Sequence, residues 1–255
     1  MTLLYYQTFG NPNQFPIICI HGLFGSHENL MGIIRTLKED YYMIAIDCRN
    51  HGQSFHDKNM CYKTMSQDIV AILSHLNIPK CHIIGHSMGG KIAMTLATTH
   101  PEQVSSMVII DIAPVHYPNH HGAIIEGLKA IDLNQYRTRL DVINALESYI
   151  TPLPLRQFLA KNIQSKNELS WKINIAAIES NYHHISSFPK GLQCTALPSL
   201  FIGGRQSQYI QPCHYTAIRS LFTNASINFV DASHWVHAEK PKQTVDMIKA
   251  FLPPC

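Results

Sequence analysis

The chain has 255 residues, of which 45% are hydrophobic and 15% are charged. This composition is typical of a globular protein with a large core, formed by one domain with an insertion or by two small domains. The formal net charge is only +3 and no run of Lys and Arg occurs, which argues against nucleic acid as the main partner.

The N-terminal residues and the cysteines favour a cytoplasmic protein. Residues 1–6 carry neither a basic segment nor the apolar stretch of a signal peptide, and no apolar run approaches the length of about 20 residues that a membrane span needs. The seven Cys are scattered without a C-x-x-C pair, so we expect no disulfide framework.

Short apolar runs alternate with segments of helical periodicity along most of the chain. We predict strands at 3–9, 17–20, 42–46, 81–84, 104–110, 199–202 and 227–230, and helices at 29–37, 65–76, 91–97 and 241–251. Alternation of this kind predicts an α/β fold, with a mostly parallel sheet of seven to eight strands and helices on both faces. Ligands bind such sheets at the carboxyl ends of the strands.

Residues 115–192 interrupt this alternation. Their apolar spacing is helical, as at Ile124, Ile125 and Leu128, and we expect no strand among them. One interpretation is that these helices simply pack on the sheet. We favour a helical cap over the carboxyl edge, because the segment is much longer than one crossover helix. The core would then comprise residues 1–114 and 193–255.

A G-x-S-x-G motif follows the fourth predicted strand. Ser87 lies between Gly85 and Gly89, with the apolar run 81–84 before it and the helical run 91–97 after it. A strand, a Ser between glycines and a helix in this order predict a nucleophile elbow. Without that context, a bystander Ser in a Gly-rich turn would be the better interpretation.

A Ser nucleophile needs a base, and His is the usual one. In this architecture the chain order is Ser, acid, His, which points to the loop after the last strand. His234 lies in that loop and is our candidate. His237 is the alternative, although its place next to a helix favours a packing role.

The carboxylate that should orient His234 has an unusual position in the chain. The usual place for it follows the strand 199–202, yet no Asp or Glu occurs from Ser180 through Val230. Asp111 ends the preceding strand 104–110 and can reach the same imidazole from there. Its alternative role is a turn or helix-capping residue. Ser207 stands where the acid is missing, and its hydroxyl is a candidate to donate to Asp111.

Two backbone N–H groups should bind the oxyanion of the tetrahedral intermediate. Met88 directly follows the nucleophile and Leu23 lies in the Gly-rich loop 21–26, so we assign the oxyanion hole to them. We interpret His21 as a structural residue that orders this loop. The polar segment 47–54 either faces substrate or, as we prefer, is held near the elbow by an Arg–Asp pair.

A metal site is not expected. The adjacent histidine pairs 120–121 and 183–184 lack the i, i+4 spacing of a helical zinc pair and any supporting carboxylate or Cys pattern. No other cofactor is needed for the chemistry of Ser, His and Asp.

Taken together, these segments resemble the α/β-hydrolase superfamily and, within it, the YbfF-type esterases. The resemblance spans nearly the whole chain, through HGLFGS (21–26), DCRNHG (47–52), GHSMGGK (85–91), IDIAP (110–114), WKIN (171–174) and HWVHAEKP (234–241). It implies a Ser–His–Asp esterase with its acid before a small helical cap, acting on short- to medium-chain acyl esters or acyl-CoA thioesters. Lys172 stands where Arg is common in the family.

The sequence therefore predicts a serine carboxylesterase that works through an acyl-enzyme. Its partner would be a small-molecule acyl ester or thioester, and the protein would be a monomer or homodimer. We expect Phe24, His86 and Trp235 to contact the substrate. The alternatives are a thioesterase, a carbon–carbon bond hydrolase, or a receptor that keeps the fold without catalysis.

Overall fold

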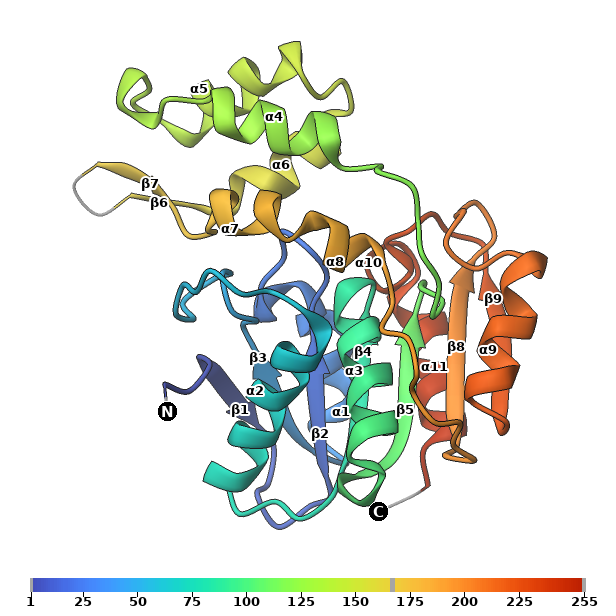
Figure 1. Cartoon of the computed structure of the whole chain (residues 1–255). Coiled ribbons are helices and arrows are strands. Elements are labelled where there is room, and N and C mark those ends of the chain that lie inside the picture. Colours follow the sequence, from blue (N-terminus) through green and yellow to red (C-terminus); the bar gives the residue numbers. More distant parts are fainter. Residues whose placement is uncertain (1, 166–167, 254–255) are drawn as a thin grey trace.

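A mostly parallel sheet of seven strands forms the centre of the molecule. The computed structural model describes residues 2–165 and 168–253. Figure 1 shows the sheet, in which the strand order is β1-β3-β2-β4-β5-β8-β9. Every neighbouring pair is parallel except β1 and β3, which are antiparallel. The predicted α/β fold is therefore confirmed.

The elements of this layer follow the predicted order. Its strands are β1 (Tyr6–Phe9), β2 (Pro16–Ile20), β3 (Tyr42–Ile46), β4 (Cys81–His86), β5 (Val104–Ile110), β8 (Ser199–Gly204) and β9 (Ala225–Val230). Its helices are α1 (Met31–Leu37), α2 (Tyr62–His75), α3 (Met88–Thr99), α9 (Tyr215–Leu221), α10 (Val236–Glu239) and α11 (Pro241–Phe251). Short 3₁₀ turns of this layer lie at His27–Leu30, Pro101–Gln103 and Pro212–His214. Others lie between β5 and β8, at Leu133–Gln135 and Leu146–Ser148. The first strand begins at Tyr6, later than expected.

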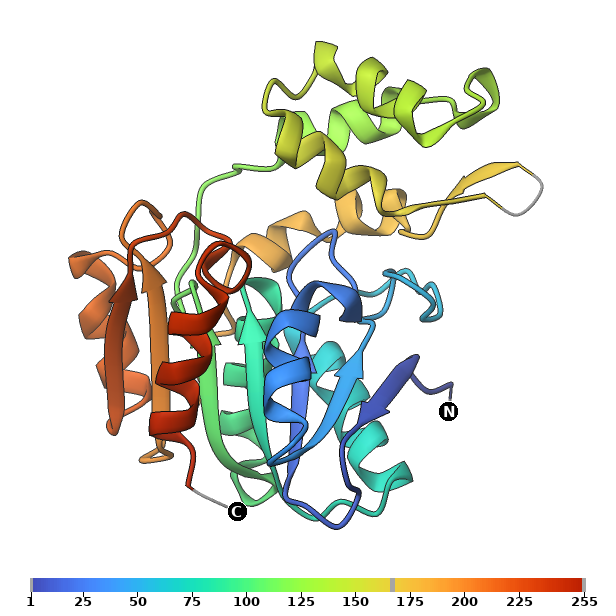
Figure 2. The same ribbon diagram turned by 180° about the vertical axis from the view of Figure 1, so that it is seen from behind.

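Helices cover both faces of the sheet. On β2, Ile18 and Ile20 belong to the apolar cluster that includes α2 and α3, whereas Ile17 and Cys19 belong to the cluster of α1 and α11. This alternation follows from the two-residue period of a strand. Helices α2 and α3 are in front of the sheet in Figure 1, and α1 and α11 are in front in the reverse view of Figure 2. Because both faces are buried, β2 is apolar along its whole length.

The segment between β5 and β8 forms a separate layer above the carboxyl ends of the strands (Figure 1). It contains α4 (Gly122–Ala130), α5 (Arg139–Ala145), α6 (Leu153–Ala160), α7 (Ile175–Ser180) and α8 (Tyr182–Ser186). We call residues 115–192 the cap.

The expectation of a cap without strands is wrong. Two three-residue strands, β6 (Ile163–Ser165) and β7 (Leu169–Trp171), pair antiparallel. Ile163, which continues the helical apolar spacing of α6, instead pairs with Trp171. Strands this short contain too little alternation to be separated from a helical pattern by sequence.

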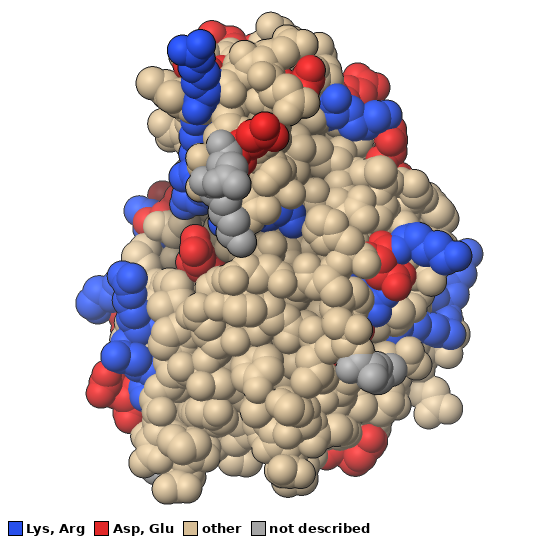
Figure 3. Space-filling model, turned by 90° about the vertical axis from the view of Figure 1, so that its left-hand side faces the viewer, with Lys and Arg blue, Asp and Glu red and all other residues tan. Residues whose placement is uncertain are grey.

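Charged side chains of both signs are scattered over the surface. On the face that includes the β6–β7 hairpin, the described Lys and Arg side chains are interspersed with Asp and Glu around a broad uncharged area (Figure 3). Within the described residues, no helix combines the length and the apolar content needed to cross a bilayer.

The connection from β4 to α3 is closely packed at two glycines. A Cβ atom at Gly85 would lie 2.4 Å from the carbonyl oxygen of Gly89, and one at Gly89 would lie 2.3 Å from that of Ile20. Both contacts are with backbone, which cannot move aside as a flexible side chain can. The motif therefore requires glycine here because β2, β4 and α3 approach so closely.

A pair of glycine substitutions tests this packing. Gly89→Ala should lower the free energy of unfolding by about 3 kcal/mol, since overpacking typically costs this much. Gly32 is the matched control because it is also helical and a Cβ there would meet nothing within 4 Å. Gly32→Ala should raise the free energy of unfolding by up to about 1 kcal/mol. Urea unfolding of both variants measures the difference, and equal stability of the two would contradict the account.

Candidate active site

The nucleophile elbow has the strained geometry that its motif predicts. Ser87 has φ 52° and ψ −118° and separates the last residue of β4 from the first of α3. A non-glycine residue in this region persists only where its surroundings hold it. The Ser87 N–H donates to the carbonyl of Ile110 at 3.0 Å, which ties the turn to β5. The hydroxyl is thus presented at the N-terminus of α3.

Asp111 is fully buried at the end of β5 and receives three hydrogen bonds. Its Oδ1 accepts from the Gly204 N–H at 2.9 Å. Its Oδ2 accepts from His234 Nδ1 at 2.7 Å and from the hydroxyl of Ser207. A buried carboxylate is costly unless such donors surround it. The structure thus brings together Asp111, Ser207 and His234, all three of which the sequence singled out.

His234 is held by its neighbours on both sides. Its ring stacks on Tyr209 with 4.1 Å between the centroids, and its backbone carbonyl accepts from His86 Nε2 at 3.0 Å. Because Nδ1 donates to Asp111, the other ring nitrogen, Nε2, is left as an acceptor. Burial lowers the pKa of His86 well below its usual value, so His86 stays neutral.

His237, the alternative candidate for the base, packs against the ring of His86. The two rings are 4.4 Å apart between centroids, and His237 Nδ1 is buried without a hydrogen-bond partner among the described residues. Burial lowers the pKa of His237 to about 4. Its position is that of a packing residue, whereas His234 contacts Asp111.

The loop that follows β2 is ordered by two buried histidines. His21 donates from Nδ1 to the carbonyl of Gly22 at 2.7 Å, and its Nε2 accepts from the Cys48 N–H at 2.9 Å. Phe24 has φ 60°, and its N–H donates to His51 Nε2 at 3.1 Å. The structural role expected for His21 agrees with these contacts.

Neither of the two N–H groups expected in the oxyanion hole has an acceptor within the described part of the chain. Met88 is the first residue of α3, where helical N–H groups lack an intrahelical partner, and Leu23 lies in the open loop. Leu23 and Met88 both line the same recess as Ser87. The two groups are therefore available to an anionic oxygen formed next to Ser87.

The polar segment after β3 makes structural contacts. Arg49 donates from Nε and Nη2 to the two carboxylate oxygens of Asp68 on α2, at 2.7 and 2.8 Å. The expected Arg–Asp pair is present, and its carboxylate is Asp68 on α2, outside the segment. Asp47 accepts from the backbone and ring of His27 and from the Gln53 N–H. Two separate carboxylates therefore hold the segment.

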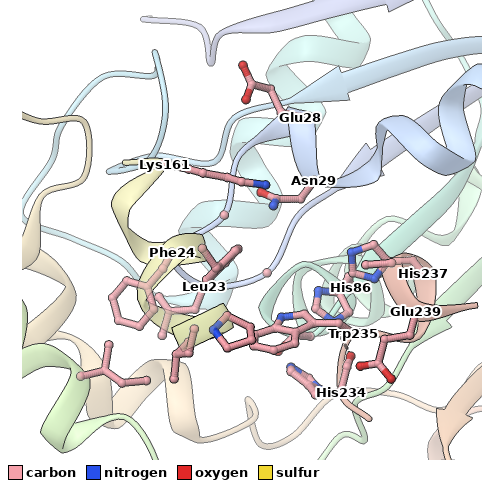
Figure 4. A pocket seen from close by; sticks show the side chains of 18 of the residues that line it. Leu23, Phe24, Glu28, Asn29, His86, Lys161, His234, Trp235, His237 and Glu239 are labelled. Carbon is pink, nitrogen blue, oxygen red and sulfur yellow. Dashed lines mark hydrogen bonds between the residues drawn. The ribbon is translucent and has the colours of Figure 1, made fainter. Parts of the chain in front are cut away.

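A cavity of about 360 Å³ opens beside Ser87 and His234. Figure 4 shows Leu23 and Phe24 on one side of it and His86, His234 and Trp235 on the other. The three residues expected to contact substrate, Phe24, His86 and Trp235, all line it. Cap residues that the sequence did not indicate as part of the site complete the wall: His121, Ile124, Pro154, Leu155, Phe158 and Lys161. Leu155 and Phe158 show the apolar spacing of a helix, which does not tell a cavity wall from a packed core.

A smaller recess of about 30 Å³ also borders Ser87. Its lining includes Met88, Lys91, Ile112, Tyr117 and Tyr182. Ser87 therefore borders both the large cavity and the small recess. Within the described residues, no three His, Cys, Asp or Glu side chains gather as a metal site would require.

Comparison with known proteins agrees with this geometry. Residues 16–241 match the model of the α/β hydrolase fold family. The chain belongs to this family. It is 35% identical to esterase YbfF of Escherichia coli over 94% of either chain, and 37% identical to the sn-1-specific diacylglycerol lipase ABHD11 of Danio rerio over 98% of this chain and 83% of that one. A solved structure described as a marine microorganism esterase superposes with a TM-score of 0.96 and 36% identity, covering 99% of this chain and 100% of that one.

The burial of His237 predicts a dependence of stability on pH. With a pKa of about 4 in the folded protein and about 6.5 in the unfolded chain, the unfolded state binds the extra proton between these values. Stability is therefore lost as the pH falls below 6.5. Between pH 7 and pH 5 the wild type should lose about 2 kcal/mol more than a His237→Leu variant. Urea unfolding at the two pH values measures this, and parallel losses in both proteins would contradict it.

Proposed function

We propose that this protein is a serine carboxylesterase in which Ser87 is the nucleophile, His234 the general base and Asp111 the acid that orients it. The observation that carries the proposal is the 2.7 Å contact between Asp111 Oδ2 and His234 Nδ1, with His234 and Ser87 lining one cavity. A Ser–His–Asp arrangement of this kind is recognised by geometry and roles.

The first half of the reaction transfers the acyl group to Ser87. His234 Nε2 takes the hydroxyl proton as the Ser87 oxygen attacks the ester carbonyl, and a tetrahedral oxyanion forms. The bond between the acyl carbon and the leaving alcohol then breaks, and the alcohol oxygen takes from His234 the proton that came from Ser87. The buried negative charge of Asp111 stabilises the imidazolium while it holds the proton.

The oxyanion is assigned to the N–H groups of Leu23 and Met88. Both lack another acceptor in the described structure and both border the recess at Ser87. Donors that are already in place need no reorganisation when the charge forms, and losing one such donor typically costs a factor of about 10²–10³ in kcat. The strained backbone at Ser87 helps by fixing the hydroxyl relative to Met88.

The second half regenerates the enzyme with water. His234 Nε2 removes a proton from a water molecule, the resulting hydroxide attacks the acyl carbon, and Ser87 leaves with the proton from His234. The carboxylic acid is released. No cofactor takes part in either half.

We assign Ser207 a supporting role. Its hydroxyl donates to Asp111 Oδ2, the oxygen that also accepts from His234. Ser207 lies after β8, where related hydrolases usually carry the acid. The hydroxyl thus occupies the usual position of the acid, and its hydrogen bond stabilises part of the buried negative charge of Asp111.

The substrate class follows from the cavity and the relatives. Leu23, Phe24, Leu155 and Phe158 make the cavity wall largely apolar, which favours an acyl chain of short to medium length. Relatives named as esterases and a diacylglycerol lipase support an ester bond. Faster hydrolysis of a matched thioester or vinylogous diketone than of the ester would move the proposal to a thioesterase or carbon–carbon hydrolase. A cytoplasmic location and a monomeric or dimeric state stay predictions.

Ser87→Ala tests the proposed chemistry. This variant should hydrolyse p-nitrophenyl acetate at least about 10⁴-fold more slowly than the wild type, since triad members act as a unit. A fluorophosphonate probe should label the wild type and leave the variant unlabelled, as read by intact-protein mass spectrometry.

Ser233→Ala is the matched control because Ser233 bonds to Glu239 and not to Asp111 or His234. It should keep most of the activity. Substantial hydrolysis by folded Ser87→Ala would remove Ser87 from the role of nucleophile. A folded wild type that neither reacts with the probe nor cleaves the ester would favour a binding protein instead.

A further inference from the structure

Lys91 is buried in α3, four residues after Ser87. Its side chain is among the largest that are fully buried, with 1% of the residue exposed. Its Nζ donates to three backbone carbonyls, those of Val115 at 2.9 Å, Ser186 at 2.9 Å and Ser187 at 2.8 Å. All three protons of the ammonium thus have acceptors.

These carbonyls belong to the two ends of the cap. Val115 lies where the chain leaves β5, and Ser186 and Ser187 lie at the end of α8, where it returns toward β8. The Tyr117 N–H also donates to the Ser186 carbonyl, at 2.9 Å, so the two connections run side by side. Figure 1 shows both of them passing between the cap layer and the sheet. We call this crossing the neck of the cap.

The ammonium has no carboxylate partner among the described residues. It faces the rings of Tyr117 and Tyr62, with 4.8 and 5.8 Å from Nζ to the centroids. The Tyr62 hydroxyl in turn donates to the carbonyl of Ile185. Burial lowers the pKa of Lys91 to about 7, which shows that the interior disfavours the charge. The charge is therefore stabilised mainly by the neck carbonyls, and moving the neck would remove its acceptors.

The position of the cap determines the shape of the acyl site. Leu155 and Phe158 of α6 form part of the wall of the large cavity. Lys91 and Tyr117 line the small recess, which also contains Ser87. A shift of the neck would therefore displace both walls relative to Ser87. An octanoyl chain must contact these walls over more of its length than an acetyl group does.

We infer that Lys91 is a positioning residue that holds the neck and thereby sets the selectivity for acyl esters long enough to reach the cap. This inference rests on the proposed esterase activity. Lys91 contacts neither Asp111 nor His234, so its loss should affect a long ester more than a short one.

Lys91→Met tests the inference, since it keeps an unbranched side chain and removes the three donors. For p-nitrophenyl octanoate, KM should rise about tenfold, the loss expected when charge-assisted hydrogen bonds to the neck disappear. For p-nitrophenyl acetate, kcat/KM should fall less, so that the octanoate-to-acetate ratio of kcat/KM drops at least about threefold. Thr95→Val is the matched control, because buried Thr95 donates to the Lys91 carbonyl on the same helix without contacting the neck. It should lower Tm and leave the octanoate-to-acetate ratio unchanged.

The outcomes separate this inference from the proposed function. If the wild type hydrolyses neither ester, the proposed function fails. If the wild type is active and folded Lys91→Met loses both activities equally, or neither, the inference is overturned.

Should Lys91→Met not fold, the wild type supplies a second measurement. With ¹⁵N-labelled lysine at about pH 6, below the pKa of Lys91, its ammonium protons should exchange with water much more slowly than those of surface lysines, because all three are hydrogen-bonded. Equal exchange of all lysine ammonium groups would overturn the inference.

Discussion

The buried carboxylate of Asp111 is the charge around which the site is organised. A carboxylate without exposure is unfavourable unless donors surround it, and here the donors are the Gly204 N–H, the Ser207 hydroxyl and the His234 ring. These three groups come from β8, from the loop after it and from the loop after β9. Satisfying one charge thus draws together the end of β5, residues 204–207 and the loop after β9, which are far apart in the chain, and it fixes which nitrogen of His234 donates to Asp111.

The elbow and the neck extend this arrangement to the rest of the molecule. Ser87 is presented from the start of α3, and Lys91 of the same helix holds the two connections of the cap. In our proposal, α3 and the residue before it therefore carry the nucleophile, an N–H for the oxyanion and the contact that positions the cap. In our proposal the chemistry depends on the first two, and the choice of acyl chain depends on the third.

The parts that sequence could predict are those with a local or compositional signal. The Gly–Ser–Gly turn is a local motif of five residues. The absence of Asp and Glu from Ser180 through Val230 points to Asp111 as the acid. The β6–β7 hairpin and the pairing of Arg49 with Asp68 depend on tertiary packing, which a single sequence does not contain. The neck is harder still to foresee, because Lys91 bonds only to backbone carbonyls and these carry no residue identity.

The most direct test of Asp111 as the acid is the kcat of Asp111→Asn on p-nitrophenyl acetate, beside Asp231→Asn. Asp231 is the nearest carboxylate after β9, and it bonds to Gln206 instead of His234. The account predicts a loss of about 10⁴-fold for Asp111→Asn, as an amide would favour the wrong tautomer of His234, and little change for Asp231→Asn. A folded Asp111→Asn that loses less than about tenfold, or a large loss in Asp231→Asn, would contradict it.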